Sequence, residues 1–309
     1  MKLRLKTLQL ELTSLCNLRC PLCFSTTKEK SNLPPFFPFA DLVSLLSKLP
    51  TEVETVNLYG KVGEPLLYSE IVAAVKEARK RFPNARLRIS TNGMLLSDYL
   101  AEGLAASPLD TLFVALDGAT KESYKKYRRR GNFKKVCKNI KAFSRLKKGG
   151  NRKLPRLMVQ FIPMAHNLTE TAQLVTLAHE LGANGVRIKI CGSVTRNKKF
   201  NPGPSVTEVV KEALHELPWS LECKTIRTGF CSFDELYVDC AGNIYPCCHA
   251  AAENALLIGN CRLEEKAIWQ KRMLQMRRHY EKERPKICQD KCGPVRNKSL
   301  FTVSFKKSQ

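Results

Sequence analysis

The chain has 309 residues and a formal net charge of +24, because 52 lysines and arginines outnumber 28 aspartates and glutamates. The excess lies in two segments. Residues 121–156 hold 16 basic residues and one acid, and residues 271–309 hold 12 basic residues and three acids. The charge of the remaining chain is balanced, which excludes a uniformly basic histone-like or ribosomal protein and indicates a neutral globular body with two basic surfaces.

Composition and the amino terminus predict a cytoplasmic globular protein. Hydrophobic residues make up 43% of the chain, too many for an intrinsically disordered protein. No apolar run approaches the roughly 20 residues of a membrane-spanning helix, and Lys6 and Glu11 interrupt any signal-peptide core. Because disulfides are rare in the cytoplasm, the 13 cysteines are assigned to metal binding, catalysis or core packing.

The first two thirds of the chain alternate between short apolar runs and longer amphipathic stretches. The runs predicted as strands are 6–12, 55–59, 86–90, 112–116, 157–161 and 185–190. The stretches predicted as helices are 39–49, 69–82, 96–106, 133–146 and 169–181. This alternation predicts an α/β fold with parallel strands and helical crossovers. Six such units are too few for an eight-stranded barrel, so an open sheet or a partial barrel remains.

The pattern changes in the last third of the chain. Lysine, asparagine, proline and glycine gather at 197–204 and predict a linker. Beyond it cysteines become dense, short strands flank a Gly-Asn turn at 242–243, and a helix is predicted over 263–280. We therefore predict two domains, 1–220 and 221–309, the second a small α+β unit. The last ten residues are predicted to form a frayed basic tail.

Three cysteines stand within eight residues directly after the first predicted strand, at Cys16, Cys20 and Cys23. A complete structural zinc site needs four ligands. Three thiolates in one loop instead suit an iron–sulfur cluster that leaves one iron open. Packing cysteines and an incomplete zinc site are the alternatives.

This spacing resembles the signature of the radical S-adenosylmethionine (SAM) superfamily, and further segments match in order over about residues 1–190. They are the glycine–glutamate loop at 60–67, the strand ends at 90–93 and 116–118, and the arginine-containing stretch at 127–131. The resemblance implies a partial (β/α)6 barrel and a SAM-binding 4Fe-4S cluster on the three cysteines. The residues it assigns to SAM are Gly60, Gly63, Glu64, Pro65, Thr91, Asn92, Asp117 and Arg130, the last chosen among three neighbouring arginines for the SAM carboxylate.

The carboxyl-terminal third, over about 223–295, resembles the auxiliary-cluster extension called SPASM or its shorter form, twitch. The resemblance makes Cys231, Cys247, Cys288 and Cys292 the ligands of one auxiliary 4Fe-4S cluster, with a structural zinc ion as the alternative. By analogy with radical epimerases, Cys248, or alternatively Cys223, is a candidate donor that returns hydrogen to a substrate radical.

The implied enzyme reductively cleaves SAM to a 5′-deoxyadenosyl radical and abstracts hydrogen from a substrate C–H. We expect the auxiliary cluster to assist dehydrogenation or epimerisation of a small molecule such as a sugar or cyclitol. The alternatives are maturation of a ribosomally made peptide or protein side chain and, less favoured, RNA modification. The basic segment 121–156 is either a solvated helix face or a surface for an anionic substrate, nucleic acid or an acidic electron donor such as flavodoxin or ferredoxin.

Overall fold

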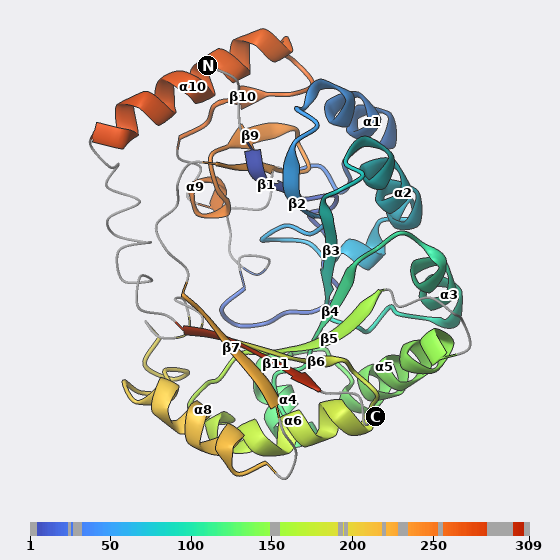
Figure 1. Ribbon diagram of the computed structural model, residues 1–309, viewed down its shortest axis with the longest axis vertical. Coiled ribbons are helices and arrows are strands. Elements are labelled where there is room, and N and C mark those ends of the chain that lie inside the picture. Colours follow the sequence, from blue (N-terminus) through green and yellow to red (C-terminus); the bar gives the residue numbers. More distant parts are fainter. Residues whose placement is uncertain are drawn as a thin grey trace.

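The computed structural model describes residues 5–23, 26, 33–148, 155–190, 194, 197–217, 221–227, 234–252, 256–282 and 299–305. Its centre is a curved sheet with most helices on the outer side (Figure 1). Among the helices described, none combines the length and the apolar character that crossing a membrane requires.

Six parallel strands form the barrel wall in chain order. They are β1 (Leu5–Leu10), β2 (Val53–Asn57), β3 (Arg86–Thr91), β4 (Thr111–Ala115), β5 (Arg156–Phe161) and β6 (Gly185–Lys189). Each pairs in parallel with the next. The strands predicted from the apolar runs are thus present, and their order confirms the partial (β/α)6 barrel.

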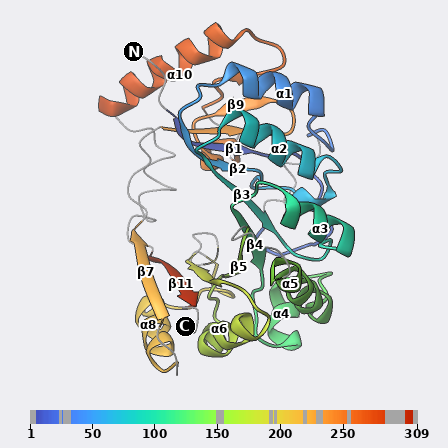
Figure 2. The same ribbon diagram turned by 45° about the vertical axis from the view of Figure 1, so that its right-hand side comes forward.

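Helical crossovers cover the outer side of these strands (Figure 2). They are α1 (Phe39–Lys48), α2 (Ile71–Arg81), α3 (Asp98–Ala106), α4 (Lys121–Tyr127), α5 (Phe133–Lys148) and α6 (Thr171–Glu180). Five match predicted helices. The additional short helix α4 begins at a capping box, in which the Thr120 side chain accepts from the Ser123 backbone N–H and Ser123 reciprocates.

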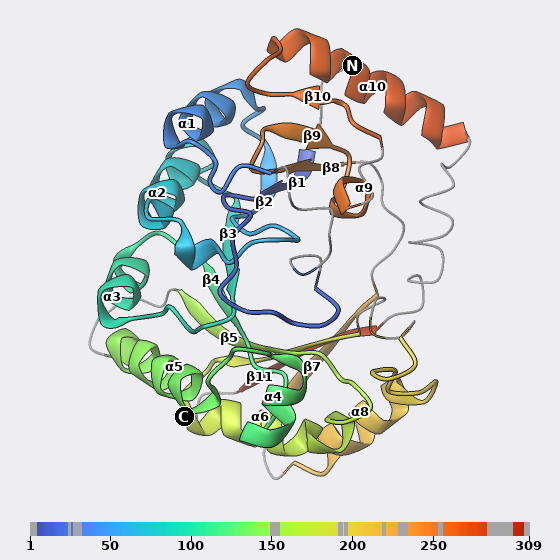
Figure 3. The same ribbon diagram turned by 180° about the vertical axis from the view of Figure 1, so that it is seen from behind.

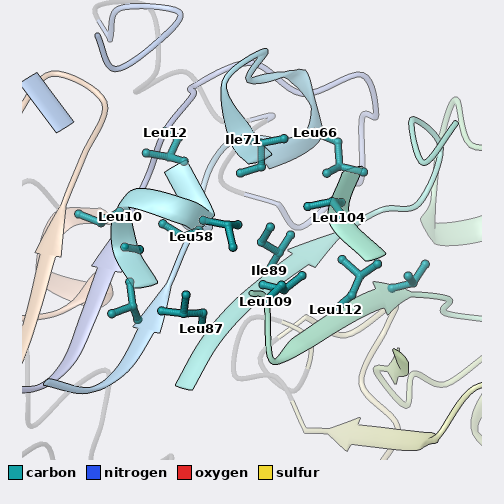
Figure 4. Close-up of a cluster of buried hydrophobic side chains, with 14 of the residues drawn as sticks. Leu10, Leu12, Leu58, Leu66, Ile71, Leu87, Ile89, Leu104, Leu109 and Leu112 are labelled. Carbon is teal, nitrogen blue, oxygen red and sulfur yellow. The ribbon is translucent and has the colours of Figure 1, made fainter. Parts of the chain in front are cut away.

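Strand alternation decides what faces the helices and what faces the barrel interior. Leucine and isoleucine side chains of successive strands meet those of the crossover helices in one apolar core (Figure 4). Residues between them on the same strands, such as Arg88 between Leu87 and Ile89, belong to the opposite, inner face. The inner face is the one on which the blue loop after β1 lies (Figure 3).

The carboxyl-terminal part extends this sheet at both edges. The strands β8 (Glu235–Val238), β9 (Asn243–Tyr245) and β10 (Gly259–Asn260) continue it beyond β1, with β8 parallel to β1. The turn between β8 and β9 contains Gly242 at φ 85°, as the Gly-Asn signal indicated. Beyond β6, the helices among the described residues are α8 (Val206–His215), α9 (Cys248–Ala252) and α10 (Lys266–Lys282).

The opposite edge corrects one prediction. Residues expected to fray form β11 (Ser299–Phe305), which lies between β6 and β7 (Leu221–Arg227) and pairs antiparallel with both. Its sequence, SLFTVSF, is rich in β-forming residues, and the lysines that suggested a tail lie only beyond it. The boundary at 220/221 stays a prediction, and strands from beyond it complete both edges of the barrel sheet.

Candidate active site at the carboxyl ends of the barrel strands

The three cysteines of the first motif lie together on the loop after β1. The Cys23 backbone N–H donates to the Cys20 carbonyl at 3.1 Å, which makes the second half of the loop a tight turn. Cys20 is buried, whereas Cys16 and Cys23 are half-buried. No three of the described His, Cys, Asp or Glu side chains converge on a single-ion position; a 4Fe-4S cluster instead takes each thiolate on a separate iron.

Donors directed at the sulfur atoms fit such a cluster. The Leu18 N–H donates to Cys16 Sγ at 3.4 Å, and Arg128 Nη1 lies 3.9 Å from Cys20 Sγ. Burial raises the pKa of Cys20 to about 11, and the Arg128 guanidinium opposes this shift. Hydrogen bonds and positive charge favour a thiolate over a thiol, but at Cys20 they offset only part of the effect of burial, and the thiol loses its proton when it binds the metal.

Arg128 is held beside the cysteines by a buried carboxylate. Its Nε donates to Asp117 Oδ2 at 2.7 Å, while the other oxygen of Asp117 accepts from the Ile162 N–H at 2.8 Å. The Arg128 side chain is 13% exposed and that of Asp117 is fully buried. Burial lowers the pKa of Arg128, but Asp117 together with Cys20, Tyr127 and Tyr124 outweighs it, so the pKa lies well above its ordinary value.

Arg130, the residue chosen from sequence, is placed differently. It is exposed, with a left-handed backbone at φ 67°. The structure therefore brings Arg128 rather than Arg130 to the cysteine loop. A sequence signal for this exists, because Tyr127 and Arg128 follow Tyr124 by three and four residues on one helical face, and both tyrosines are buried.

The glycine loop after β2 packs tightly against the end of β1. A Cβ on Gly63 would lie 1.8 Å from the Thr13 carbonyl oxygen, and one on Gly60 would lie 2.0 Å from Glu11 Oε2. The Glu64 N–H donates to the Leu15 carbonyl at 2.7 Å. Only glycine permits this approach, which fixes the loop next to the cysteine loop.

Glu64 binds its own chain. Its buried carboxylate accepts from the Leu66 N–H at 3.1 Å, the Asn92 N–H at 2.8 Å and the Thr91 hydroxyl. Burial raises the pKa of Glu64, and these hydrogen bonds oppose the shift. Glu64 thus ties the loop after β2, where Pro65 begins a 3-10 turn, to the end of β3.

The end of β3 also reaches the cysteine loop, because Asn92 Nδ2 donates to Asn17 Oδ1 at 2.7 Å. Apart from Arg130, the residues assigned to SAM from sequence therefore lie at the carboxyl ends of β2, β3 and β4, beside the cysteine loop that follows β1. Carboxyl ends of parallel strands are where α/β barrels place their functional groups. Asn17 was not among the residues singled out from sequence.

A buried network that sequence reasoning missed joins the glycine loop to the carboxyl-terminal part. Glu11 Oε2 accepts from the Lys61 N–H at 2.9 Å, the Val62 N–H at 3.0 Å and the Tyr237 hydroxyl. Lys61 Nζ donates to the Cys248 carbonyl at 3.3 Å. The available signal was Glu11 itself, a carboxylate that interrupts an apolar strand.

Two cysteines of the second motif are described. Cys247 is buried, and its Sγ accepts from the Ala250 N–H at 3.4 Å. Cys248 is half-buried at the start of α9. Cys231, Cys288 and Cys292 lie outside the described residues, as does the side chain of Cys223, so the predicted ligand set stays a prediction.

Family comparison agrees with this geometry. The model of the radical SAM superfamily matches residues 10–181, which is more than half of the chain. The chain belongs to the radical SAM superfamily. The model of SPASM, an iron–sulfur cluster-binding domain, matches residues 230–293. The protein is therefore a radical SAM protein whose cofactors are SAM, a 4Fe-4S cluster and auxiliary iron–sulfur.

One curated relative is the probable GTP 3′,8-cyclase of Methanocaldococcus jannaschii, 28% identical over 182 residues. The match covers 58% of this chain and 57% of the relative, so the chain spans little more than half of that protein.

Two solved structures share the fold. Native anSMEcpe with bound AdoMet matches with a TM-score of 0.67 at 16% identity, over 89% of this chain and 82% of that one. SuiB of Streptococcus suis, bound to precursor peptide SuiA, matches with a TM-score of 0.65 at 16% identity, over 86% and 65%. At these identities the likeness concerns the fold.

Proposed function

We propose that the chain abstracts hydrogen from a C–H bond of a small molecule such as a sugar or cyclitol, leading to dehydrogenation or epimerisation with the help of one auxiliary 4Fe-4S cluster. When bound, the first cluster and SAM supply the 5′-deoxyadenosyl radical. In this proposal Cys16, Cys20 and Cys23 hold the cluster, and the strand ends hold SAM.

The protein's own residues position these groups. The Asp117–Arg128 pair holds a guanidinium beside Cys20, where we propose that it binds the SAM carboxylate in place of Arg130. Glu64 keeps the glycine loop against the end of β3, which leaves the backbone of the loop to meet the SAM ammonium.

The observation that carries the proposal of an assisting auxiliary cluster is the bond from Lys61 to the Cys248 carbonyl. It connects the loop assigned to SAM with the cysteine pair assigned to the auxiliary site. A group at Cys247 would therefore sit on the same hydrogen-bonded framework as SAM. Cys248, next to this bond, is the proposed hydrogen donor if the outcome is epimerisation.

Anaerobic reconstitution tests this function. We expect about eight irons per chain, as two four-iron clusters require, and 5′-deoxyadenosine formation after reduction. About four irons with one zinc would overturn the auxiliary cluster, and absence of SAM cleavage would overturn the radical chemistry. For the hydrogen donor, Cys248→Ala should abolish return of solvent deuterium to substrate, whereas Cys137→Ala, at a half-buried cysteine on α5, should not. Full return in Cys248→Ala would remove that role.

A peptide substrate is the alternative outcome, since SuiB shares the fold and was solved with a precursor peptide. Consumption of SAM coupled to a peptide but to no sugar or cyclitol would replace the small-molecule proposal.

We also propose that an acidic flavodoxin or ferredoxin supplies the electron by docking on the outer face of α4 and α5. The exposed basic residues there are Lys121, Lys125, Lys126, Arg129, Arg130, Lys134, Lys135, Lys138, Lys141 and Arg145. This face meets the cluster loop directly, because the Arg19 N–H donates to the Arg129 carbonyl at 3.1 Å. A donor bound near Arg129 would therefore lie next to the loop segment that carries Arg19, between Cys16 and Cys20.

A further inference from the structure

The inner face of the barrel carries a group of polar and aromatic side chains from five neighbouring strands. The strands contribute, in order, Tyr59 just after β2, Arg88 on β3, Phe113 on β4, Gln160 on β5 and Arg187 on β6. None belongs to the apolar core that the strands share with the helices. None was assigned a role from sequence, and the site at the strand ends uses none of them.

Arg187 is fixed in this interior. Its guanidinium carbon lies 3.4 Å from the centroid of the Phe113 ring, and Nη2 donates to Gln160 Oε1. Stacking on the ring and a neutral acceptor hold the group in one orientation. Its Nε is buried, and the described residues offer that atom no hydrogen-bond partner. Beside the hydrogen bonds to Gln160 and Tyr59, one donor atom of the guanidinium therefore has no partner among the described residues.

Arg88 brings a second positive charge to the same place. Burial lowers the pKa of both arginines, Tyr59 opposes the shift at each, and Arg187 lowers the pKa of Arg88 further. Throughout the described part of the chain, the ion pairs include no carboxylate paired with Arg88 or Arg187. Two half-buried guanidinium groups thus face the same interior with the Tyr59 side chain near both, and Asp110, the carboxylate that acts on Arg88, is ion-paired with Arg79 instead.

Such an arrangement costs stability unless an anion completes it. A guanidinium binds the paired oxygens of carboxylate and phosphate groups with two parallel hydrogen bonds. The alternative, a purely structural role, requires a carboxylate partner or full hydrogen bonding, and Arg187 has neither within the described residues. Resting on the proposed function, we infer that Arg88 and Arg187 form an oxyanion subsite that binds a carboxylate or phosphate group of the substrate.

The strand register places this subsite near the cofactor side. Arg187 pairs with Gln160, and Gln160 pairs with Ala115, which stands two residues before Asp117. Two residues of strand span about 7 Å. A substrate anchored at Arg187 would therefore extend toward the strand ends where SAM is proposed to bind, and neutral sugars without an anionic group would lack this anchor.

Binding of simple anions to the reconstituted holoenzyme tests the subsite without turnover. Inorganic phosphate and acetate are titrated separately at constant ionic strength, with calorimetric heat and the thermal unfolding midpoint as readouts. We expect at least one anion to bind and raise the midpoint. Phosphate alone would indicate a phosphorylated substrate, and acetate alone a carboxylic acid. Absence of binding by both would overturn the proposal.

Variants locate the binding. Arg187→Met and Arg88→Met should each weaken anion affinity at least tenfold, whereas Arg145→Met, which removes the same charge from an exposed position of α5, should leave it unchanged. Equal weakening in all three would show a non-specific charge effect and overturn the subsite.

A stability readout separates binding from a structural role. Without anions, Arg187→Met should unfold within about 2 °C of the parent or higher, since it removes a shielded charge. A clearly lower midpoint, together with no anion effect in the parent, would make the arginine structural and overturn the inference. Failure of the parent to cleave SAM would overturn the proposed function and leave the anion result standing.

Discussion

At the scale of single residues, the positively charged Arg128 side chain can be buried because it forms an ion pair with the Asp117 carboxylate. The next two residues in the chain, Arg129 and Arg130, remain exposed. The buried pair costs desolvation, which its geometry and the further hydrogen bond from Ile162 to Asp117 offset. The pair therefore serves to position the guanidinium next to Cys20 rather than to stabilise the fold.

Substitution of Arg128 tests whether Asp117 and the SAM site depend on this ion pair. Arg128→Gln leaves the Asp117 carboxylate buried without its partner, so we expect a loss of about 3–5 kcal/mol in the free energy of unfolding. Arg128→Lys keeps the charge but not the forked geometry, and should weaken SAM binding at least tenfold. Chemical denaturation and equilibrium SAM binding measure the two effects. Arg130→Gln is the control, and a larger loss of SAM affinity there than in Arg128→Lys would restore the choice made from sequence.

At the scale of elements, two loops define the site. The loop after β1 supplies the cysteines, and the loop after β2 is pressed against it at Gly60 and Gly63. Glu64 then fastens the second loop to β3. Because each loop is held by backbone contacts with another, the cysteines and the strand ends are positioned together rather than one at a time.

A methyl group at Gly63 should separate the loops. In Gly63→Ala the new Cβ meets the Thr13 backbone at 1.8 Å, which flexible side chains cannot relieve, and we expect a loss of about 1–3 kcal/mol in unfolding free energy together with weaker SAM binding. Gly103→Ala, at a position within α3, is the matched control. Its new Cβ would meet only the Val72 side chain, at 3.1 Å. Unchanged SAM binding and stability in Gly63→Ala would show that the loop contact is dispensable.

At the scale of the whole molecule, the basic residues that give the net charge of +24 are unevenly distributed. The exposed basic residues between Lys121 and Arg145 lie on the outer face of α4 and α5, and Glu122 is the only acid in the sequence segment 121–156. The interior holds a smaller and separate basic feature at Arg88 and Arg187. The two have different partners in our proposals, an acidic protein outside and a substrate oxyanion inside.

The outer face should bind its donor electrostatically. Replacing Lys134, Lys138 and Lys141 together by Glu should weaken flavodoxin or ferredoxin binding at least tenfold at low salt and flatten its salt dependence. Association measured by biolayer interferometry, and the rate of cluster reduction, report this effect. Lys76, Lys80 and Arg86, changed to Glu together near α2, give a control with the same charge change. Salt-insensitive binding of the donor, or equal loss in both triple variants, would remove the docking face.

The sequence by itself determined the features that depend on local spacing. Each of these features lies within a short stretch of sequence: the three cysteines in eight residues, the glycine–glutamate loop, and every single strand–helix unit. The fold class and the cluster loop were therefore predictable. The sequence prediction was wrong for β11, where two terminal lysines outweighed a strand-like run, and local spacing gave no basis for choosing among three adjacent arginines at 128–130.

Only the tertiary structure decided which of these groups meet. Asp117 pairs with Arg128 rather than its neighbours, Tyr237 joins Glu11 across the chain, and Arg88 and Arg187 face one interior because β3 to β6 are neighbouring strands of one sheet. Each of these contacts links residues that are distant in sequence or indistinguishable by type. Their energies depend on burial and on the partner across the barrel, and neither is encoded in a local motif.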